Sequence, residues 1–172
     1  MIKIQDVMRA GHIKRWNIIN TTRTQTLAEH MYNVAMITHH MCMELDMNPN
    51  RMLTWALIHD IPEVVCGDIP TPTKRRIKDM GFDMETLFET IDPTYASTKY
   101  SLSEWELQLV KAADLMESIW FLEENGAGRH AMDVKQRLLV RWADLVDKMA
   151  DQRLSKVCRV TFGQIMQGKI YE

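Results

Sequence analysis

Four side chains that bind divalent metals well occur in three segments of the chain. His30 falls on an apolar helical face, Asp114 stands within a second such face, and His59 with Asp60 ends an apolar run. A buried carboxylate is costly unless it meets a partner charge or a metal ion. One ion held by all four residues would account for them. Imidazole with carboxylate suits Zn²⁺, Mn²⁺, Fe²⁺ or Co²⁺.

Simpler interpretations exist for these residues. A histidine on an apolar face is often a hydrogen-bonded core residue, and a His-Asp pair also occurs by chance. Glu63 lies four residues after His59, so a continued helix would place the two residues on the same side. Glu63 could then act as a general acid or base, or it could be an ordinary solvated residue. The remaining histidines lack matching signals, and we expect them to be surface or structural residues: His12, His39, His40 and His130.

Basic and aromatic residues flank the metal-binding candidates. Arg15 precedes Trp16, a combination that can clamp a phosphate and press on a sugar or a base. The run of Lys74, Arg75 and Arg76 follows a proline-rich turn. The plain alternatives are a core tryptophan beside a surface arginine, and a solvated basic face.

Helical periodicity predicts the elements that must position these side chains. Apolar residues at steps of three or four predict a helix over 27–45. Asn48 as N-cap with Pro49 at the first helical position predicts a second helix, which should end near Asp60. Two overlapping capping boxes precede a third helix over 103–124.

The rest of the chain is also typical of helices and loops. We expect a short helix over 81–91, loops over 67–74 and 92–98, and a last long helix over 131–157. No segment alternates with period two for long. The sequence therefore predicts an all-α fold of five to seven helices in one domain spanning 1–172.

Composition restricts the function classes. The chain has 172 residues, of which 46% are hydrophobic, and its net charge of -2 is not that of a duplex nucleic-acid binder. Its cysteines, three in number and widely spaced, fit a reducing compartment. The beginning lacks the apolar core of a signal peptide, and no apolar run approaches the roughly 20 residues that span a bilayer. We expect a cytoplasmic homo-oligomer that acts on a small molecule, without duplex nucleic acid or a membrane as partner.

The order of these residues resembles a known signature. His30, His59-Asp60 and Asp114 are similar to the H…HD…D pattern of the HD-domain metal-dependent phosphohydrolases. The strings RW at 15–16, RTxxxAEH at 23–30, HDxxEVxxGDxPTPxK at 59–74 and KAAD at 111–114 resemble bacterial 5′-deoxynucleotidases, and also phage HD enzymes that remove triphosphate from dATP. The compact stretch between the HD pair and Asp114, and the short region after the last helix, are closer to the phage enzymes.

The resemblance implies an HD-type helical bundle and roles for individual residues. A divalent ion (Zn²⁺, Co²⁺, Mn²⁺ or Mg²⁺) would bind His30, His59, Asp60 and Asp114. Glu63 and Asp68 would be catalytic or would hold a second metal ion. Arg15 and Lys74 would contact phosphate. Trp16 would lie against C2′ of the sugar, and Ile18 would line the base pocket.

The implied activity is hydrolysis of dATP to deoxyadenosine and triphosphate, which would deplete the dATP pool, in the host cytoplasm if the chain is encoded by a phage. The first alternative is a 5′-deoxynucleotidase that acts on deoxynucleoside monophosphates. The second is a non-catalytic nucleotide-binding regulator, which the intact set of metal-binding residues argues against. A triphosphate needs more cations than a monophosphate, and Lys74, Arg75 or Arg76 could supply them.

Overall fold

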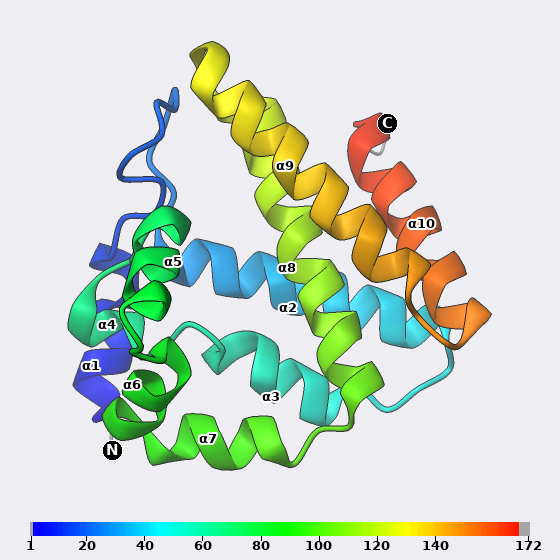
Figure 1. Ribbon diagram of the computed structural model, residues 1–172. Coiled ribbons are helices and arrows are strands. Elements are labelled where there is room, and N and C mark those ends of the chain that lie inside the picture. Colours follow the sequence, from blue (N-terminus) through cyan, green and yellow to red (C-terminus); the bar gives the residue numbers. More distant parts are fainter. Residues whose placement is uncertain (1, 169–172) are drawn as a thin grey trace.

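A computed structural model describes residues 2–168, and these form an all-α fold, as predicted (Figure 1). The helices run from α1 to α10, more than the five to seven expected, and every helix in this range is too short or too polar to span a membrane. Their bounds are α1 (Ile4–Met8), the 3₁₀ helix η1 (Arg9–His12), α2 (Leu27–Glu44), α3 (Asn50–Ile58), α4 (Glu63–Cys66), α5 (Thr71–Asp79), α6 (Met84–Ile91), α7 (Pro93–Tyr100), α8 (Glu104–Asn125), α9 (Gly128–Asp147) and α10 (Gln152–Gln167).

The centre of the fold is the packing of α2 against α3 and α8, with α9 and α10 completing the larger core (Figure 1). Both central helices begin with a cap, and the cap of the second was predicted. The Thr26 side chain accepts the Glu29 backbone N–H at 3.2 Å and caps α2. The predicted capping box of Ser103 and Glu106 forms at the start of α8, whose centre is almost wholly buried.

The segment between α3 and α8 contains more helix than predicted. The second predicted helix ends at Ile58, so that His59 caps α3 and Asp60 lies in the following turn. The loop predicted over 67–74 is wrong in its second half, because prolines that flank Thr71 are compatible with a helix start and α5 begins there. The loop predicted over 92–98 is also wrong. Asp92 accepts the Thr94 backbone N–H at 3.1 Å, Pro93 stands at the first helical position, and α7 forms.

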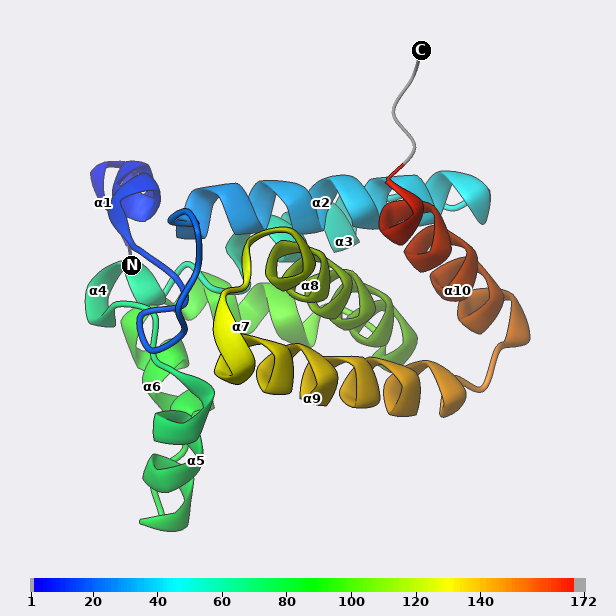
Figure 2. The same ribbon diagram turned by 90° about the horizontal axis from the view of Figure 1, so that it is seen from above.

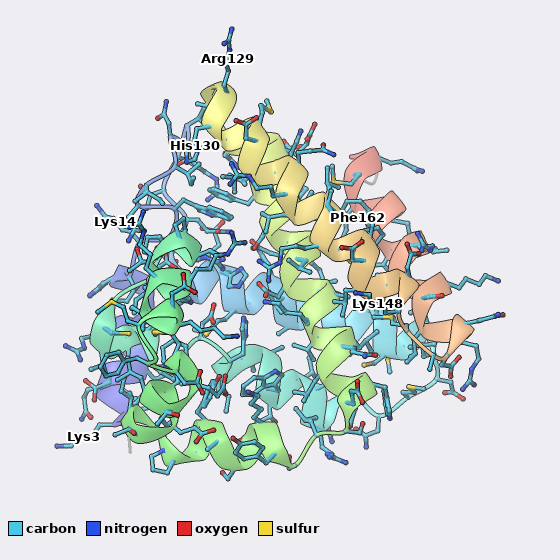
Figure 3. The ribbon with its side chains drawn as sticks, in the orientation of Figure 1. Lys3, Lys14, Arg129, His130, Lys148 and Phe162 are labelled. Atoms are coloured by element: carbon cyan, nitrogen blue, oxygen red, sulfur yellow. The ribbon has the colours of Figure 1, made fainter. Side chains whose placement is uncertain are left out.

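The prediction of a single last helix over 131–157 is likewise wrong, because α9 ends at Asp147 and a separate helix follows. Asp151 accepts the Arg153 backbone N–H at 2.8 Å, which caps a new helix and turns the chain back as α10. The two helices pack through Trp142 and Phe162, whose ring centroids lie 4.4 Å apart (Figure 3). The apolar periodicity of this region is therefore divided between two helices.

Two features place chain segments around a common space beside the core. The loop over 13–26 is tied to the junction of α8 and α9, where Thr22 N–H donates to Asn125 O at 2.8 Å and Ala127 N–H donates to Asn20 O at 2.9 Å. On the same side of the bundle as this loop, α5 projects outward and has no buried residue (Figure 2). The loop, α5, α8 and α9 thus surround one region.

We expect the junction of α8 and α9 to require glycine at position 126. A Cβ atom at Gly126 would stand 2.5 Å from the Leu122 carbonyl oxygen and 3.1 Å from Ala131 Cβ. Gly126→Ala should lower the free energy of unfolding by about 1–3 kcal/mol, in the range of overpacked sites. Urea denaturation measures this change.

Gly163→Ala is the matched control. This glycine lies inside α10 with open space around it, so alanine should raise the free energy of unfolding by about 0.5–1 kcal/mol. Equal effects of the two substitutions would contradict the steric explanation of the junction.

Candidate metal centre and substrate cavity

The structure brings the four predicted metal-binding residues together. One ligand atom each from His30, His59 and Asp60 lies within 4.8 Å of the other two. Asp114 joins them, with its Oδ1 3.2 Å from His30 Nε2. His30 comes from α2, His59 and Asp60 follow α3, and Asp114 comes from α8, so the packing of three helices creates the group.

Hydrogen bonds determine which nitrogen of each imidazole faces this group. His30 Nδ1 donates to Glu117 Oε2 at 2.5 Å, and His59 Nδ1 donates to the Ala56 carbonyl at 2.8 Å. Each Nε2 atom then carries a lone pair. Both Nε2 atoms are buried without a hydrogen-bond partner within residues 2–168. Two such imidazoles beside two carboxylates fit a divalent cation as their missing partner.

Glu117 is a functional residue that sequence reasoning missed. It is fully buried on α8 and accepts from His30 Nδ1, from Gln25 Nε2 and, at 3.2 Å, from Asn33 Nδ2. Burial raises the pKa of this carboxyl to about 7, and the donors from Gln25 and Asn33 act in the opposite direction. The available signal was its position three residues after Asp114, which places a second carboxylate on the same helical face.

Asp114 has a cationic partner, contrary to the view that it is an isolated carboxylate. Lys111, one turn earlier on α8, donates from Nζ to Asp114 Oδ2 at 2.5 Å. Burial alone would raise the pKa of Asp114, but the positive charges of Lys111 and Arg15 hold it below its ordinary value. Asp114 is therefore ionised, as a metal ligand must be.

Glu63 and Asp68 lie on the same side of the group. Glu63 is 1% exposed, its Oε1 accepts from Lys74 Nζ at 2.7 Å, and its Oε2 is buried without a partner within the described residues. Burial, together with nearby Asp60, raises the pKa of Glu63 to about 8 against the effect of Lys74. Burial also raises the pKa of Asp68. Both carboxyls line the same cavity as Asp60 and Asp114.

The cavity has a volume of about 230 Å³ and opens between the 13–26 loop, α5, α8 and α9. All four residues predicted to bind substrate line it, namely Arg15, Trp16, Ile18 and Lys74. The Nη1 atom of Arg15 is buried and has no hydrogen-bond partner among the described residues. Its Nη2 atom donates to Ser118 Oγ at 3.5 Å. An unpaired buried guanidinium beside a metal group is suited to an anion.

Several cations of the cavity wall were not predicted. Lys111 and residues of α9 line the wall, and Figure 3 shows His130 near the beginning of that helix. His130 is exposed, as expected, but its place at the cavity was not anticipated. Of the basic run on α5, the lining includes the first two residues and not Arg76. The basic residues of α9 that line the cavity and were not predicted to do so are His130, Arg137 and Arg141.

Comparisons with known proteins agree with this geometry. Residues 4–135 match the family described as 5′-deoxynucleotidase YfbR-like. A dATP triphosphohydrolase of Cyanophage S-2L is 34% identical over 136 residues, which cover 77% of this chain and 76% of the relative. A 5′-deoxynucleotidase of Erwinia tasmaniensis is 32% identical over 148 residues, covering 73% of this chain and 75% of that protein.

A solved structure has the same architecture over almost the whole length. It is the Cyanophage S-2L HD phosphohydrolase DatZ, described as bound to dA and one catalytic Zn²⁺ ion. The TM-score is 0.89 and the sequences are 27% identical, with 98% of this chain and 99% of that chain covered.

We expect Glu117→Gln to weaken metal binding while leaving the fold intact. The amide cannot reproduce a carboxylate that accepts from all three donors, so His30 loses its orientation. Affinity for Zn²⁺ should fall about 10–100-fold, the usual effect of losing such a supporting group. Competition with a chromogenic chelator measures the affinity.

Glu123→Gln provides the control on the same helix, because Glu123 pairs with Lys135 away from the metal-binding group. Its Zn²⁺ affinity should equal that of the unmodified protein. An unchanged affinity in Glu117→Gln would show that Glu117 does not support the metal-binding histidine.

Proposed function

Since the chain belongs to the YfbR-like family of 5′-deoxynucleotidases, we propose that it is a metal-dependent phosphohydrolase that converts dATP to deoxyadenosine and triphosphate. The observation that carries the proposal is a group with two partnerless imidazole nitrogens that adjoins a cavity through Asp60 and Asp114. Acidic side chains and Arg15, which has one buried nitrogen without a partner among the described residues, line the same cavity. A metal group beside an anion site is suited to phosphate-ester hydrolysis.

In this proposal His30, His59, Asp60 and Asp114 hold the divalent ion. When bound, the ion would supply Lewis acidity, which activates water and polarises a phosphoryl oxygen. Water attacks the α-phosphorus, the bond from phosphorus to the 5′-oxygen breaks, and the three phosphoryl groups leave together. Arg15 and Lys74 offset the charge that develops on the oxygens of the reacting phosphate.

Glu63 is our proposed proton carrier for this reaction, with Asp68 beside it. Glu63 presents its free Oε2 while Lys74 holds Oε1, so the carboxyl is fixed in one orientation. A proton must leave the attacking water and another must reach the departing 5′-oxygen. A carboxyl held at the cavity wall is suited to both transfers.

Trp16 and Ile18 are proposed to recognise the nucleoside. The Trp16 ring lies parallel to Phe121 with centroids 6.0 Å apart, so its position in the cavity wall is restricted. A large fixed ring against C2′ would leave no room for a 2′-hydroxyl. Ile18 is 52% exposed where it lines the cavity, and an apolar surface there suits a base.

The distribution of cations favours a triphosphate over a monophosphate. Arg75 lies on α5 and Arg141 on α9, and both line the cavity and a hollow that adjoins it. Neither has an acidic partner within 4 Å among the described residues. A monophosphate at Lys74 would leave these guanidinium groups unused, whereas the β- and γ-phosphates of dATP could reach them.

The products formed from dATP test the proposed function. Purified protein with Zn²⁺, Co²⁺, Mn²⁺ or Mg²⁺ should release deoxyadenosine and triphosphate in equal amounts, with triphosphate identified by ³¹P NMR and deoxyadenosine by chromatography. Stepwise release of single phosphates, or hydrolysis of dAMP only, would favour the 5′-deoxynucleotidase alternative. If the protein binds dATP but none of the four metal ions supports its hydrolysis, the result would favour the non-catalytic nucleotide-binding regulator.

Arg75→Gln and Arg141→Gln test the triphosphate site. Each should raise KM for dATP about tenfold, which corresponds to about 1.4 kcal/mol, with little change for dAMP. Arg76→Gln is the matched control, because Arg76 adjoins Arg75 in sequence but does not line the cavity. Equal losses on dATP and dAMP would place the two arginines at the reacting phosphate.

A further inference from the structure

A buried chain of hydrogen bonds joins the proposed sugar-contacting residue to a metal-binding histidine. Trp16 Nε1 donates to Gln25 Oε1 at 2.7 Å, Gln25 Nε2 donates to Glu117 Oε1, and His30 Nδ1 donates to Glu117 Oε2 at 2.5 Å. The other three residues of this hydrogen-bonded series are each 0% exposed: Gln25, Glu117 and His30. Water therefore cannot replace a lost partner without a rearrangement.

The direction of every bond in the chain follows from its first donor. An indole nitrogen can only donate, so the oxygen of the Gln25 amide must face Trp16. Its NH₂ group must then face Glu117, which accepts on both oxygens. Because the N–H group of His30 is at Nδ1 and donates a hydrogen bond to Glu117, its Nε2 keeps a lone pair for a metal ion.

Trp16 also needs an anchor because of its backbone conformation. Its φ of 64° lies in the left-handed region, which is uncommon and strained for a bulky residue. The bond to Gln25 and the parallel contact with Phe121 hold the indole in place. Loss of the Gln25 bond would leave the indole its contact with Phe121 and the Arg15 guanidinium over its ring at 5.5 Å, and neither contact is a hydrogen bond to its N–H.

We propose that Gln25 is a positioning residue that serves the deoxyribose contact and the metal-binding group at once. Its oxygen anchors Trp16 against the sugar, and its NH₂ group orients Glu117, which in turn orients His30. Part of this inference rests on the proposed function, since the contact of Trp16 with C2′ belongs to it. The coupling between indole and metal does not depend on the substrate.

Gln25→Met tests both ends of the chain, because methionine has a similar shape and cannot hydrogen-bond in this way. The Trp16 indole N–H signal in a ¹⁵N NMR spectrum, assigned with Trp16→Phe, should move toward the position of a free indole. Loss of Zn²⁺ to a chelator should become about 10-fold faster. The ratio of kcat/KM for ATP to that for dATP should rise severalfold.

Asn33→Ala is the matched control, because Asn33 donates to Glu117 Oε1 but has no bond to Trp16 or Gln25. It should accelerate Zn²⁺ loss while leaving the indole signal and the ATP-to-dATP ratio unchanged. If Gln25→Met behaves like Asn33→Ala in all three measurements, Gln25 does not position Trp16 and the proposal is overturned.

Trp16→Phe tests the coupling from the other end and replaces Gln25→Met if that variant fails to fold. It keeps an aromatic ring but removes the donor that orients the Gln25 amide. Faster loss of Zn²⁺ supports the proposal, whereas a rate equal to that of the unmodified protein overturns it. If the indole and Zn²⁺ results agree while the unmodified protein does not distinguish ATP from dATP, the coupling stands and the proposed sugar selectivity fails.

Discussion

The architecture of the site depends on one buried hydrogen bond, from His30 of α2 to Glu117 of α8. Both side chains are fully buried, so each would carry a large desolvation cost without the other. The bond also commits the Nδ1 proton of His30. Its Nε2 atom is then left facing His59, Asp60 and Asp114, and a divalent ion completes an arrangement that protein groups alone leave unsatisfied.

The rest of the cavity brings acidic and basic side chains together around this point, with Lys74 paired to Glu63 and Lys111 to Asp114. Carboxylates of Asp60, Asp114 and Glu63 lie near the metal-binding histidines, while guanidinium and ammonium groups come from the loop, α5 and α9. A phosphate ester placed between them meets Lewis acidity on one side and cations on the other. Residues of α5 and α9 line both this cavity and the hollow that adjoins it.

Local sequence signals predicted the central helices well. Periodic apolar residues and the Ser103 capping box define α2 and α8. Of the motif residues, Asp60, Glu63, Asp68 and Asp114 line one cavity in the structure. The helix α7 was missed because a short Asp-Pro start competes with turn signals, and its stability comes from burying Tyr95 against Trp55, with ring centroids 5.0 Å apart.

Tertiary proximity accounts for what the sequence could not predict at the site. Glu117 stands in an ordinary helical stretch, and only the packing of α2 on α8 brings it to His30. Arg137 and Arg141 read as residues on a solvated face of α9, and only the break between α9 and α10 and the position of α5 place them at the cavity. These two arginines stand more than 20 residues after Asp114, too far along the chain for a local pattern to join them to the motif.

The central claim is that both imidazoles bind one divalent ion through Nε2, and Co²⁺ substitution tests it directly. ¹H NMR of the Co²⁺ protein in H₂O should show two strongly shifted, exchangeable N–H signals, from Nδ1 of His30 and of His59. Both should reach full intensity at one ion per chain and vanish in D₂O, and His30→Ala and His59→Ala should each remove one. No shifted exchangeable signals at saturating Co²⁺, or signals that survive both substitutions, would contradict the account.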